Sequence, residues 1–340
     1  MGAHELYETA QTIVASHKGI LAADESTGTI KKRFDSIGVS STEENRRFYR
    51  QLLFTAPGME DAIGGVILYD ETLRQSADDG TPFAEVLASK SVIPGIKVDS
   101  GAHDLAGFPG EKITEGLDGL RGRLKEYRER GARFAKWRAV ITIGDGIPSV
   151  ACIRANAHAL ARYAALCQEA GIVPIVEPEV LMDADNTIER CYDVTSRTVK
   201  WTFHELIVQG VDLRGVLLKP NMVISGKGCA TQASAEQIAE LTIQCFMMHV
   251  PAAVPGIVFL SGGQSEVEAT ENLNAINQLG GPWPLSFSYG RALQASALEV
   301  WAGDAANAEA AQAVFVHRAR MNALAAAGEW SAGMELPVTA

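Results

Sequence analysis

The 340-residue sequence has few cysteines, no long apolar run and no excess of basic side chains. Its five cysteines are scattered, which is typical of free thiols in a reducing compartment and excludes a disulfide-stapled fold. No apolar stretch approaches the ~18 residues that a membrane-spanning helix needs. Because 41 acidic side chains outnumber 30 basic ones, for a net charge of -11, nucleic acid is excluded as the main partner.

Targeting signals are missing from the amino-terminal segment as well. Residues 1–6 have neither the basic start nor the apolar core of a signal peptide. Gly2 would suit a myristoylation signal, but Leu6 stands where that signal needs Ser or Thr. Together with the free thiols, this pattern predicts a cytoplasmic protein with no membrane partner.

Nothing in the composition divides the chain, since it has no linker rich in Pro, Gly or Ser and no low-complexity segment. A hydrophobic content of 47% is ample for a large core and excludes intrinsic disorder. An α/β barrel can use a chain of this length as one domain. We therefore expect a single domain over residues 1–330 and an irregular tail over residues 331–340.

Short apolar, β-rich runs alternate with stretches of helical periodicity. The expected strands cover residues 19–25, 64–70, 94–99, 133–141, 172–180, 216–223, 256–263 and 284–290. The clearest expected helices cover residues 42–55, 151–170, 272–279 and 292–300. Ser41 and Glu44 predict a capping box for the first of these helices, and Gly171 predicts the end of the second.

Eight strands that are each followed by a helical stretch predict an α/β fold of the (β/α)8 TIM-barrel type. The rival is a doubly wound open sheet, which would require a Gly-rich dinucleotide turn after the first strand. Residues 24–29 read Asp-Glu-Ser-Thr-Gly-Thr instead, and the sequence has no Walker A motif. The barrel is therefore favoured.

Charged side chains stand in or directly after the expected strands, although a barrel strand is normally apolar on both faces. They are Asp24, Lys97, Lys136, Arg138, Glu177, Glu179, Lys219 and Arg291. Taken singly, each could be a lysine that reaches water, a solvated glutamate or a helix cap. Taken together, unpaired charges on so many strands would be costly. A single polar site at the carboxyl-terminal mouth of the barrel explains the whole set.

Lys219 is the member of this set that best suits a nucleophile. A lysine amine becomes nucleophilic when burial or a neighbouring cation lowers its pKa, and Lys136 could be that cation. The amine could then condense with a ketone to form an iminium, which allows the adjacent carbon–carbon bond to break. Glu177 and Asp24 would transfer the protons that this chemistry requires. It needs neither a metal nor a cofactor.

The loops after the seventh and eighth strands carry an independent signal for phosphate. They contain Ser261-Gly262-Gly263 and Ser288-Tyr289-Gly290-Arg291. Their glycines expose backbone N–H groups, and the arginine offers a planar pair of donors for phosphate oxygens. Barrel enzymes usually bind phosphate at these two loops.

Metal, redox and serine-nucleophile sites are less well supported. The seven histidines form no His-x-His pair, the cysteines have no C-x-x-C spacing, and no G-x-S-x-G elbow is present. Two alternatives to the Schiff-base lyase stay open on the residues alone. One is a metal-dependent sugar-phosphate isomerase or lyase on the same fold, and the other is a non-catalytic binding protein that keeps a barrel.

The segments that contain these residues resemble the class I (Schiff-base) fructose-bisphosphate aldolase family. The resemblance covers about residues 5–330, in order. The matching segments are LAADEST (21–27), STEENRRFYRQLLF (41–54), ILYDETLRQ (67–75), GIKVD (95–99), FAKWR (134–138), GIVPIVEPEV (171–180), LLKPNMV (217–223), FLSGGQSE (259–266), NLNAIN (272–277) and FSYGRALQASAL (287–298).

The resemblance implies a role for each site residue. Lys219 would be the Schiff-base lysine, Glu177 the general acid/base with Glu179 beside it, and Asp24 and Lys136 would assist bond cleavage. Ser261, Gly262, Gly290 and Arg291 would bind the C1 phosphate, and Lys97 and Ser26 would hold the C6 end. Arg138, Thr29 and Ser288 would be further substrate-binding residues. The implied partner is a sugar phosphate, fructose 1,6-bisphosphate, cleaved reversibly to glycerone phosphate and glyceraldehyde 3-phosphate by a homotetramer.

Two positions depart from the family's pattern. Thr29 stands where many relatives have Ser, and its hydroxyl could still donate to a phosphate. The last residues contain no tyrosine, whereas many animal members end in one that assists proton exchange. We therefore expect proton exchange to depend on Glu177, Glu179 or water.

Overall fold

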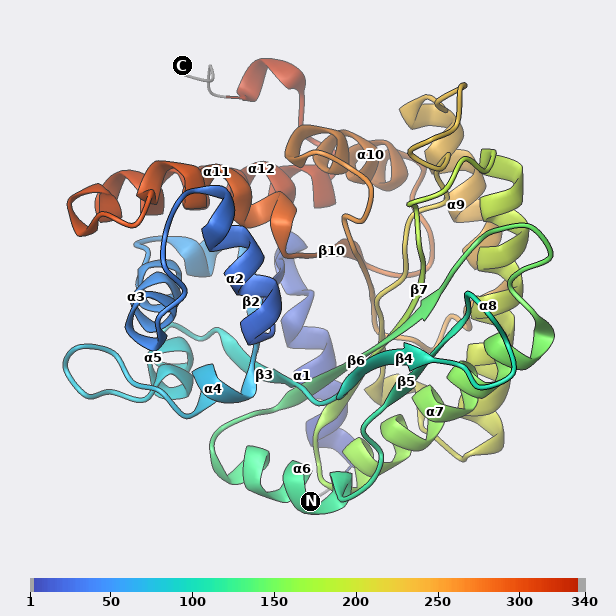
Figure 1. The fold of residues 1–340 in the computed structure, drawn as a ribbon, viewed down its shortest axis with the longest axis horizontal. Helices are drawn as coiled ribbons and strands as arrows, with labels where there is room; N and C mark the ends of the chain where they lie inside the picture. Colours follow the sequence, from blue (N-terminus) through green and yellow to red (C-terminus); the bar gives the residue numbers. More distant parts are fainter. Residues whose placement is uncertain (1–2, 336–340) are drawn as a thin grey trace.

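The computed structural model describes residues 3–335, which form a closed barrel of eight parallel strands covered by helices (Figure 1). The barrel strands are β1 (Gly19–Ala23), β2 (Ile63–Leu68), β3 (Ile93–Lys97), β6 (Phe134–Ile141), β7 (Val173–Val180), β8 (Leu217–Leu218), β9 (Ile257–Phe259) and β10 (Leu285–Tyr289). Strands that follow one another along the chain lie side by side, and β10 closes the barrel onto β1. The predicted (β/α)8 fold is confirmed, and each of the eight predicted ranges overlaps one barrel strand, although β8 and β9 are much shorter than predicted.

The sixth barrel strand, β8, is much shorter than residues 216–223. Lys219 still donates its backbone N–H to the Val176 carbonyl at 2.9 Å. Pro220 follows it and has no N–H to donate, so the regular hydrogen-bond ladder ends there. A hairpin of β4 (Gly101–Asp104) and β5 (Lys112–Glu115) interrupts the strand–helix alternation and was not predicted.

The helices around the barrel include the four that the sequence predicts. They are α1 (Ala3–Ile13), α2 (Thr27–Ser36), α3 (Glu43–Phe54), α4 (Asp70–Leu73), α5 (Phe83–Ser89), α6 (Leu120–Glu129), α7 (Val150–Glu169), α8 (Ile188–Val208), α9 (Ala235–His249), α10 (Glu266–Leu279), α11 (Arg291–Trp301) and α12 (Ala308–Ala326). Gly171 follows the cap of α7 with a φ of +70°, as expected for a residue that ends a helix. In the part of the chain that the structure describes, no helix is both long and apolar enough to cross a membrane.

The predicted capping box of α3 is wrong. Thr42 is the N-cap, and its hydroxyl accepts from the backbone N–H of Asn45 at 3.1 Å. Glu44 lies in the first turn and forms an ion pair with Arg47 instead of capping. Three consecutive residues in this segment can each cap a helix, so the composition alone does not select the correct one.

Inside the barrel, an apolar layer lies below a charged layer. Ile20, Ile67, Val173 and Val258 belong to the apolar layer, and Ala10 and Ile13 from α1 pack against it with Val14, the residue after the helix. A Cβ on Gly64 would lie 2.2 Å from the Ile13 carbonyl oxygen, so only glycine lets α1 approach this closely. Residues two apart on a strand share a face. On four strands the buried apolar residue is followed two positions later by a charged one, in the pairs Ala22–Asp24, Phe134–Lys136, Ile175–Glu177 and Leu217–Lys219.

The chain after α12 is tied to the outside of the barrel. Glu335 accepts hydrogen bonds from the buried Arg318, at 2.5 and 3.0 Å, and from the indole N–H of Trp330 at 2.9 Å. The domain boundary at residue 330 stays a prediction. The expectation drawn from the tyrosine-free end concerns residues 336–340, which lie outside the described residues.

Candidate active site

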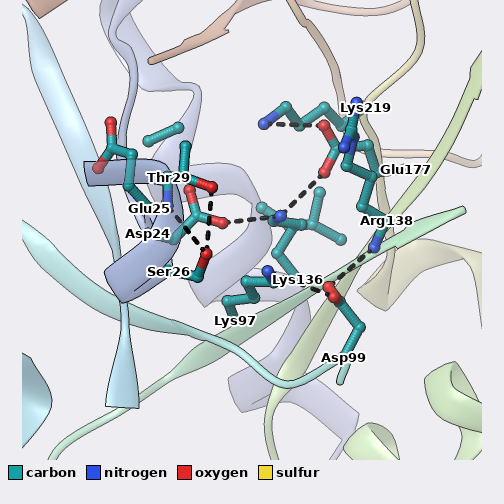
Figure 2. A network of polar contacts seen from close by, with 12 residues as sticks. Asp24, Glu25, Ser26, Thr29, Lys97, Asp99, Lys136, Arg138, Glu177 and Lys219 are labelled. Carbon is teal, nitrogen blue, oxygen red and sulfur yellow. Dashed lines mark hydrogen bonds and ion pairs between the residues drawn. The ribbon is translucent and has the colours of Figure 1, made fainter. Parts of the chain in front are cut away.

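Four charged side chains meet in the charged layer, three of them buried and the fourth, Asp24, 12% exposed (Figure 2). The Lys136 Nζ lies 2.7 Å from Asp24 Oδ2 and 3.2 Å from Glu177 Oε2, and the Lys219 Nζ lies 3.1 Å from Glu177 Oε1. Lys136, Glu177 and Lys219 are no more than 4% exposed. Two cations and two anions thus form a neutral cluster, which is how a protein tolerates charges in its interior.

The order of charges in this cluster differs from the expectation that Lys136 acts directly on Lys219. Glu177 lies between the two ammonium groups and forms an ion pair with each of them. The two lysines therefore share one carboxylate.

The electrostatics keep the cluster ionised. Burial alone would raise the pKa of Asp24 and of Glu177, but Lys136 and Lys219 outweigh it and hold both pKa values below their ordinary range. Burial would lower the pKa of Lys136, but Asp24 and Glu177 raise it above the ordinary value. Glu177 is thus a carboxylate in the ligand-free site and can accept a proton.

Two more ion pairs surround the cluster. Arg138 binds Glu179 through its Nε, and Lys97 lies 3.4 Å from Asp99 Oδ1. Asp99 also accepts the backbone N–H of Arg138 at 3.2 Å through Oδ2, which connects β6 to the end of β3. Asp99, although it stands in the GIKVD segment, was not among the predicted site residues.

All of the predicted site residues line one cavity of about 250 Å³ at the mouth of the barrel. From β1 to β6 and α2, they are Asp24, Ser26, Thr29, Lys97, Lys136 and Arg138. From β7 to α11, they are Glu177, Glu179, Lys219, Ser261, Gly262, Ser288, Gly290 and Arg291. The structure brings together every residue that the sequence placed in the site, and their roles stay predictions.

Hydroxyl groups and glycines form the wall of the cavity beside α2, α10 and α11. Ser26 is the N-cap of α2, and its hydroxyl lies 3.1 Å from that of Thr29. The Ser288 hydroxyl is buried and has no hydrogen-bond partner among the described residues. A Cβ on Gly262 would lie 3.1 Å from Glu179 Oε1, so a side chain there would crowd the site. These groups leave donors and space for a polar ligand.

Two further charged residues of the cavity were missed in the sequence. Arg33 lies on α2, and Glu25 follows Asp24 at the end of β1. The spacing of Ser26, Thr29 and Arg33 is three and then four residues, which places them on one face of a helix. That spacing is the signal that could have identified Arg33. Within residues 3–335, no group of three His, Cys, Asp or Glu side chains could hold a metal ion.

A family model described as "Glycolytic: Fructose-bisphosphate aldolase class-I" matches residues 5–338. The chain belongs to the class I fructose-bisphosphate aldolase family. It is 60% identical to a probable fructose-bisphosphate aldolase class 1 of Xanthomonas campestris over 97% of this chain and 99% of that protein. It is 54% identical to fructose-bisphosphate aldolase C of Carassius auratus, over 97% and 92% of the two chains.

A solved structure from the same family has the same fold. The fructose-bisphosphate aldolase of Plasmodium falciparum, solved in complex with TRAP and a small-molecule inhibitor, superposes with a TM-score of 0.96 at 50% identity. The match covers 97% of this chain and 96% of that chain. The likeness spans the barrel and its mouth together.

Proposed function

We propose that this protein is a class I fructose-bisphosphate aldolase of glycolysis and gluconeogenesis. It would be a lyase that cleaves fructose 1,6-bisphosphate reversibly to glycerone phosphate and glyceraldehyde 3-phosphate through a Schiff base on Lys219. The observation that carries this proposal is the buried neutral cluster of Asp24, Lys136, Glu177 and Lys219 at the barrel mouth.

Schiff-base formation begins with the proton that Lys219 and Glu177 can share. Glu177 takes a proton from the Lys219 ammonium, and the free amine attacks the C2 ketone to give a carbinolamine. Glu177 then returns the proton to the departing C2 hydroxyl, which leaves as water, and an iminium remains on Lys219. Lys136 stabilises the Glu177 carboxylate whenever that group is ionised.

Cleavage follows from the iminium. A base, for which Asp24 is best placed beside Lys136, takes the C4 hydroxyl proton. The C3–C4 bond breaks, its electron pair enters the iminium as an enamine, and glyceraldehyde 3-phosphate leaves. Protonation of the enamine at C3 and hydrolysis of the imine release glycerone phosphate and restore Lys219.

The phosphates would bind at the ends of the cavity. Ser261, Gly262, Ser288, Gly290 and Arg291 would hold the C1 phosphate, and Lys97, Ser26 and Thr29 would hold the C6 end. The unpartnered Ser288 hydroxyl and the exposed Arg291 support this assignment. Arg33, which the cavity adds to the predicted residues, would contribute a guanidinium close to Gly290.

Borohydride trapping tests the mechanism. Reduction in the presence of substrate should fix the glycerone phosphate moiety on the peptide that contains Lys219. Lys219→Met should abolish trapping and nearly all turnover while the fold is retained, because methionine fills the space of the stem without the amine. Trapping on Lys136, or turnover by the Lys219→Met enzyme, would contradict the mechanism. Loss of activity in chelator would favour a metal-dependent lyase instead.

The proposal extends to assembly and location. We expect a cytoplasmic homotetramer, in keeping with the free cysteines and with apolar side chains left on the surface. Ile207 and Val208 on α8 are 60% and 64% exposed, and Met247 and Met248 on α9 are 58% and 66% exposed. Such side chains are candidates for burial between subunits. Sedimentation equilibrium should give the mass of four chains, and a monomer mass would refute the tetramer.

A further inference from the structure

A second buried charge cluster lies beside the substrate cavity, on the other side of β1 from the lysines. Glu25 forms ion pairs with Arg33 through Oε1 and with Arg50 through Oε2, the second at 2.5 Å. The Gln294 amide donates to Glu25 Oε1 at 3.1 Å and to the Ala22 carbonyl at 2.9 Å. These contacts connect α2, α3 and α11 to the first barrel strand.

The members of this cluster differ in their access to the cavity. The side chains of Glu25 and Arg50 are 5% and 3% exposed, whereas that of Arg33 is 24% exposed. Glu25 and Arg33 line the cavity, and Arg50 does not. Arg33 is therefore the guanidinium of this cluster that a ligand can reach, whereas Arg50 lies behind the cavity wall.

The charges of the cluster do not balance. One carboxylate faces two guanidinium groups, so the triad carries one net positive charge, whereas the cluster around Lys219 is neutral. Burial would raise the pKa of Glu25, but Arg50 and Arg33 outweigh it and lower the pKa, so Glu25 stays ionised. A buried ionic triad is a poor means of stabilising a fold, since apolar residues of similar size often do better. An anion bound in the cavity would neutralise the excess positive charge of the triad.

Arg33 is close to the loop that carries the predicted C1 phosphate residues. A Cβ on Gly290 would lie 3.5 Å from Arg33 Nη2 and 3.3 Å from the Ala22 carbonyl oxygen. Gly290 precedes Arg291, so the two arginines border the same end of the cavity. An arginine side chain that is fixed before the ligand arrives loses less conformational entropy on binding.

We propose that Glu25 is a positioning residue for substrate phosphate: with Arg50 behind it, Glu25 holds the Arg33 guanidinium at the Gly290 rim, ready to bind the C1 phosphate. The inference rests on the proposed aldolase function and goes beyond the residues assigned there. Glu25 pairs with Arg33 and Arg50 and not with Lys219, and its negative charge would repel a phosphate rather than bind it. Its effect passes through Arg33, so it should change phosphate affinity and leave the carbon–carbon chemistry intact.

Glu25→Gln is the test, because it keeps the size and one acceptor oxygen and removes the charge. KM should rise about tenfold for both fructose 1,6-bisphosphate and fructose 1-phosphate, since both carry the C1 phosphate, and kcat should change less than about twofold. Glu25→Asp, which keeps the charge, should recover part of the affinity. A rise confined to fructose 1,6-bisphosphate would place Arg33 at the C6 end and overturn the proposal, as would an unchanged KM or a loss confined to kcat.

A double-variant cycle separates positioning from a general loss of structure. If Glu25 acts through Arg33, Glu25→Gln should add no further rise in KM in an Arg33→Met background. A further rise of the same size would refute the mechanism. If the Glu25→Gln protein does not fold, the double variant Glu25→Gln/Arg50→Met is the alternative, because it removes the buried guanidinium that Glu25 would otherwise leave unpaired. Its KM should show the same tenfold rise. An unchanged KM in this double variant would overturn the proposal.

Borohydride trapping at saturating glycerone phosphate distinguishes this proposal from the aldolase function itself. The Glu25→Gln enzyme should still be trapped on Lys219. If the Glu25→Gln enzyme is trapped on Lys219 and its KM is unchanged, the role proposed for Glu25 is wrong, but the aldolase function stands. An absence of trapping in the unaltered enzyme overturns the proposed function.

Discussion

Lys136→Met removes one cation from a buried neutral cluster and should destabilise the protein in a pH-dependent way. The Lys136 Nζ lies 2.7 Å from Asp24 and 3.2 Å from Glu177, and its side chain is 4% exposed. Methionine fills the space of the stem but leaves two carboxylates facing one remaining lysine. Removing one partner from a buried ion pair typically costs about 3–5 kcal/mol, and we expect that loss at pH 8.

The sign of the pH dependence follows from the pKa values. In the unaltered protein the pKa values of Asp24 and Glu177 are lowered, so their ionised forms stabilise the fold above about pH 4, and this contribution is lost as the pH falls through the folded-state values. Without Lys136, burial should raise one of these pKa values above its unfolded value. The folded variant then takes up a proton on acidification, so the destabilisation should shrink between pH 8 and pH 5.

Urea unfolding followed by tryptophan fluorescence at pH 8, 6.5 and 5 measures both effects. The matched control is Lys31→Met, because Lys31 lies 2.7 Å from Asp35 and both side chains of this pair are exposed, at 61% and 52%. The control should lose about 1 kcal/mol or less and show little change with pH. A loss below about 1 kcal/mol for Lys136→Met, or the same loss at pH 8 and pH 5, would refute the reasoning.

Two further variants test the phosphate end of the cavity. Arg291→Ala should raise KM by about one to two decades for substrates that carry a C1 phosphate, because a hydrogen bond to a charged group contributes about 1.5–3 kcal/mol. An equal rise in KM for substrates without that phosphate would mean that the phosphate site has been assigned to the wrong loop. Ser288→Ala should leave the free energy of unfolding within about 0.5 kcal/mol or raise it, because its hydroxyl is buried and unpartnered, while KM rises severalfold; a clear loss of stability with unchanged KM would show that the hydroxyl is structural.

The barrel could be predicted from sequence because each of its strands is marked by a pattern within a short stretch of sequence. Each predicted run is apolar, bounded by turn residues and followed by a helical stretch, and the polar residue types at the strand ends pointed to a site at the mouth. The β4–β5 hairpin could not be predicted in this way. Its strand residues, Gly-Ala-His-Asp and Lys-Ile-Thr-Glu, are largely polar, and their pairing depends on packing against the barrel.

The arrangement of charges was not predictable from the same patterns. The sequence placed Lys136 and Lys219 on the same interior but could not show that Glu177 lies between them, since this depends on how three strands are staggered. Glu25 follows Asp24, so it faces the other side of the strand. Its partner Arg50 lies 25 residues away and Gln294 lies 269 residues away, and only the closed barrel brings them together.

The barrel interior has two layers with different roles. The apolar layer stabilises the fold, and the charged layer contains the reacting groups. In the lower layer, selection can act on packing alone, since no reacting group lies there. In the upper layer, each ionised side chain is retained at the expense of the fold, because well-packed apolar residues of similar volume commonly give a more stable interior. An inactive variant in which apolar residues replace all four charged side chains would therefore be more stable than this protein. A variant in which only one of them is replaced would be less stable, because the remaining three charges would no longer balance.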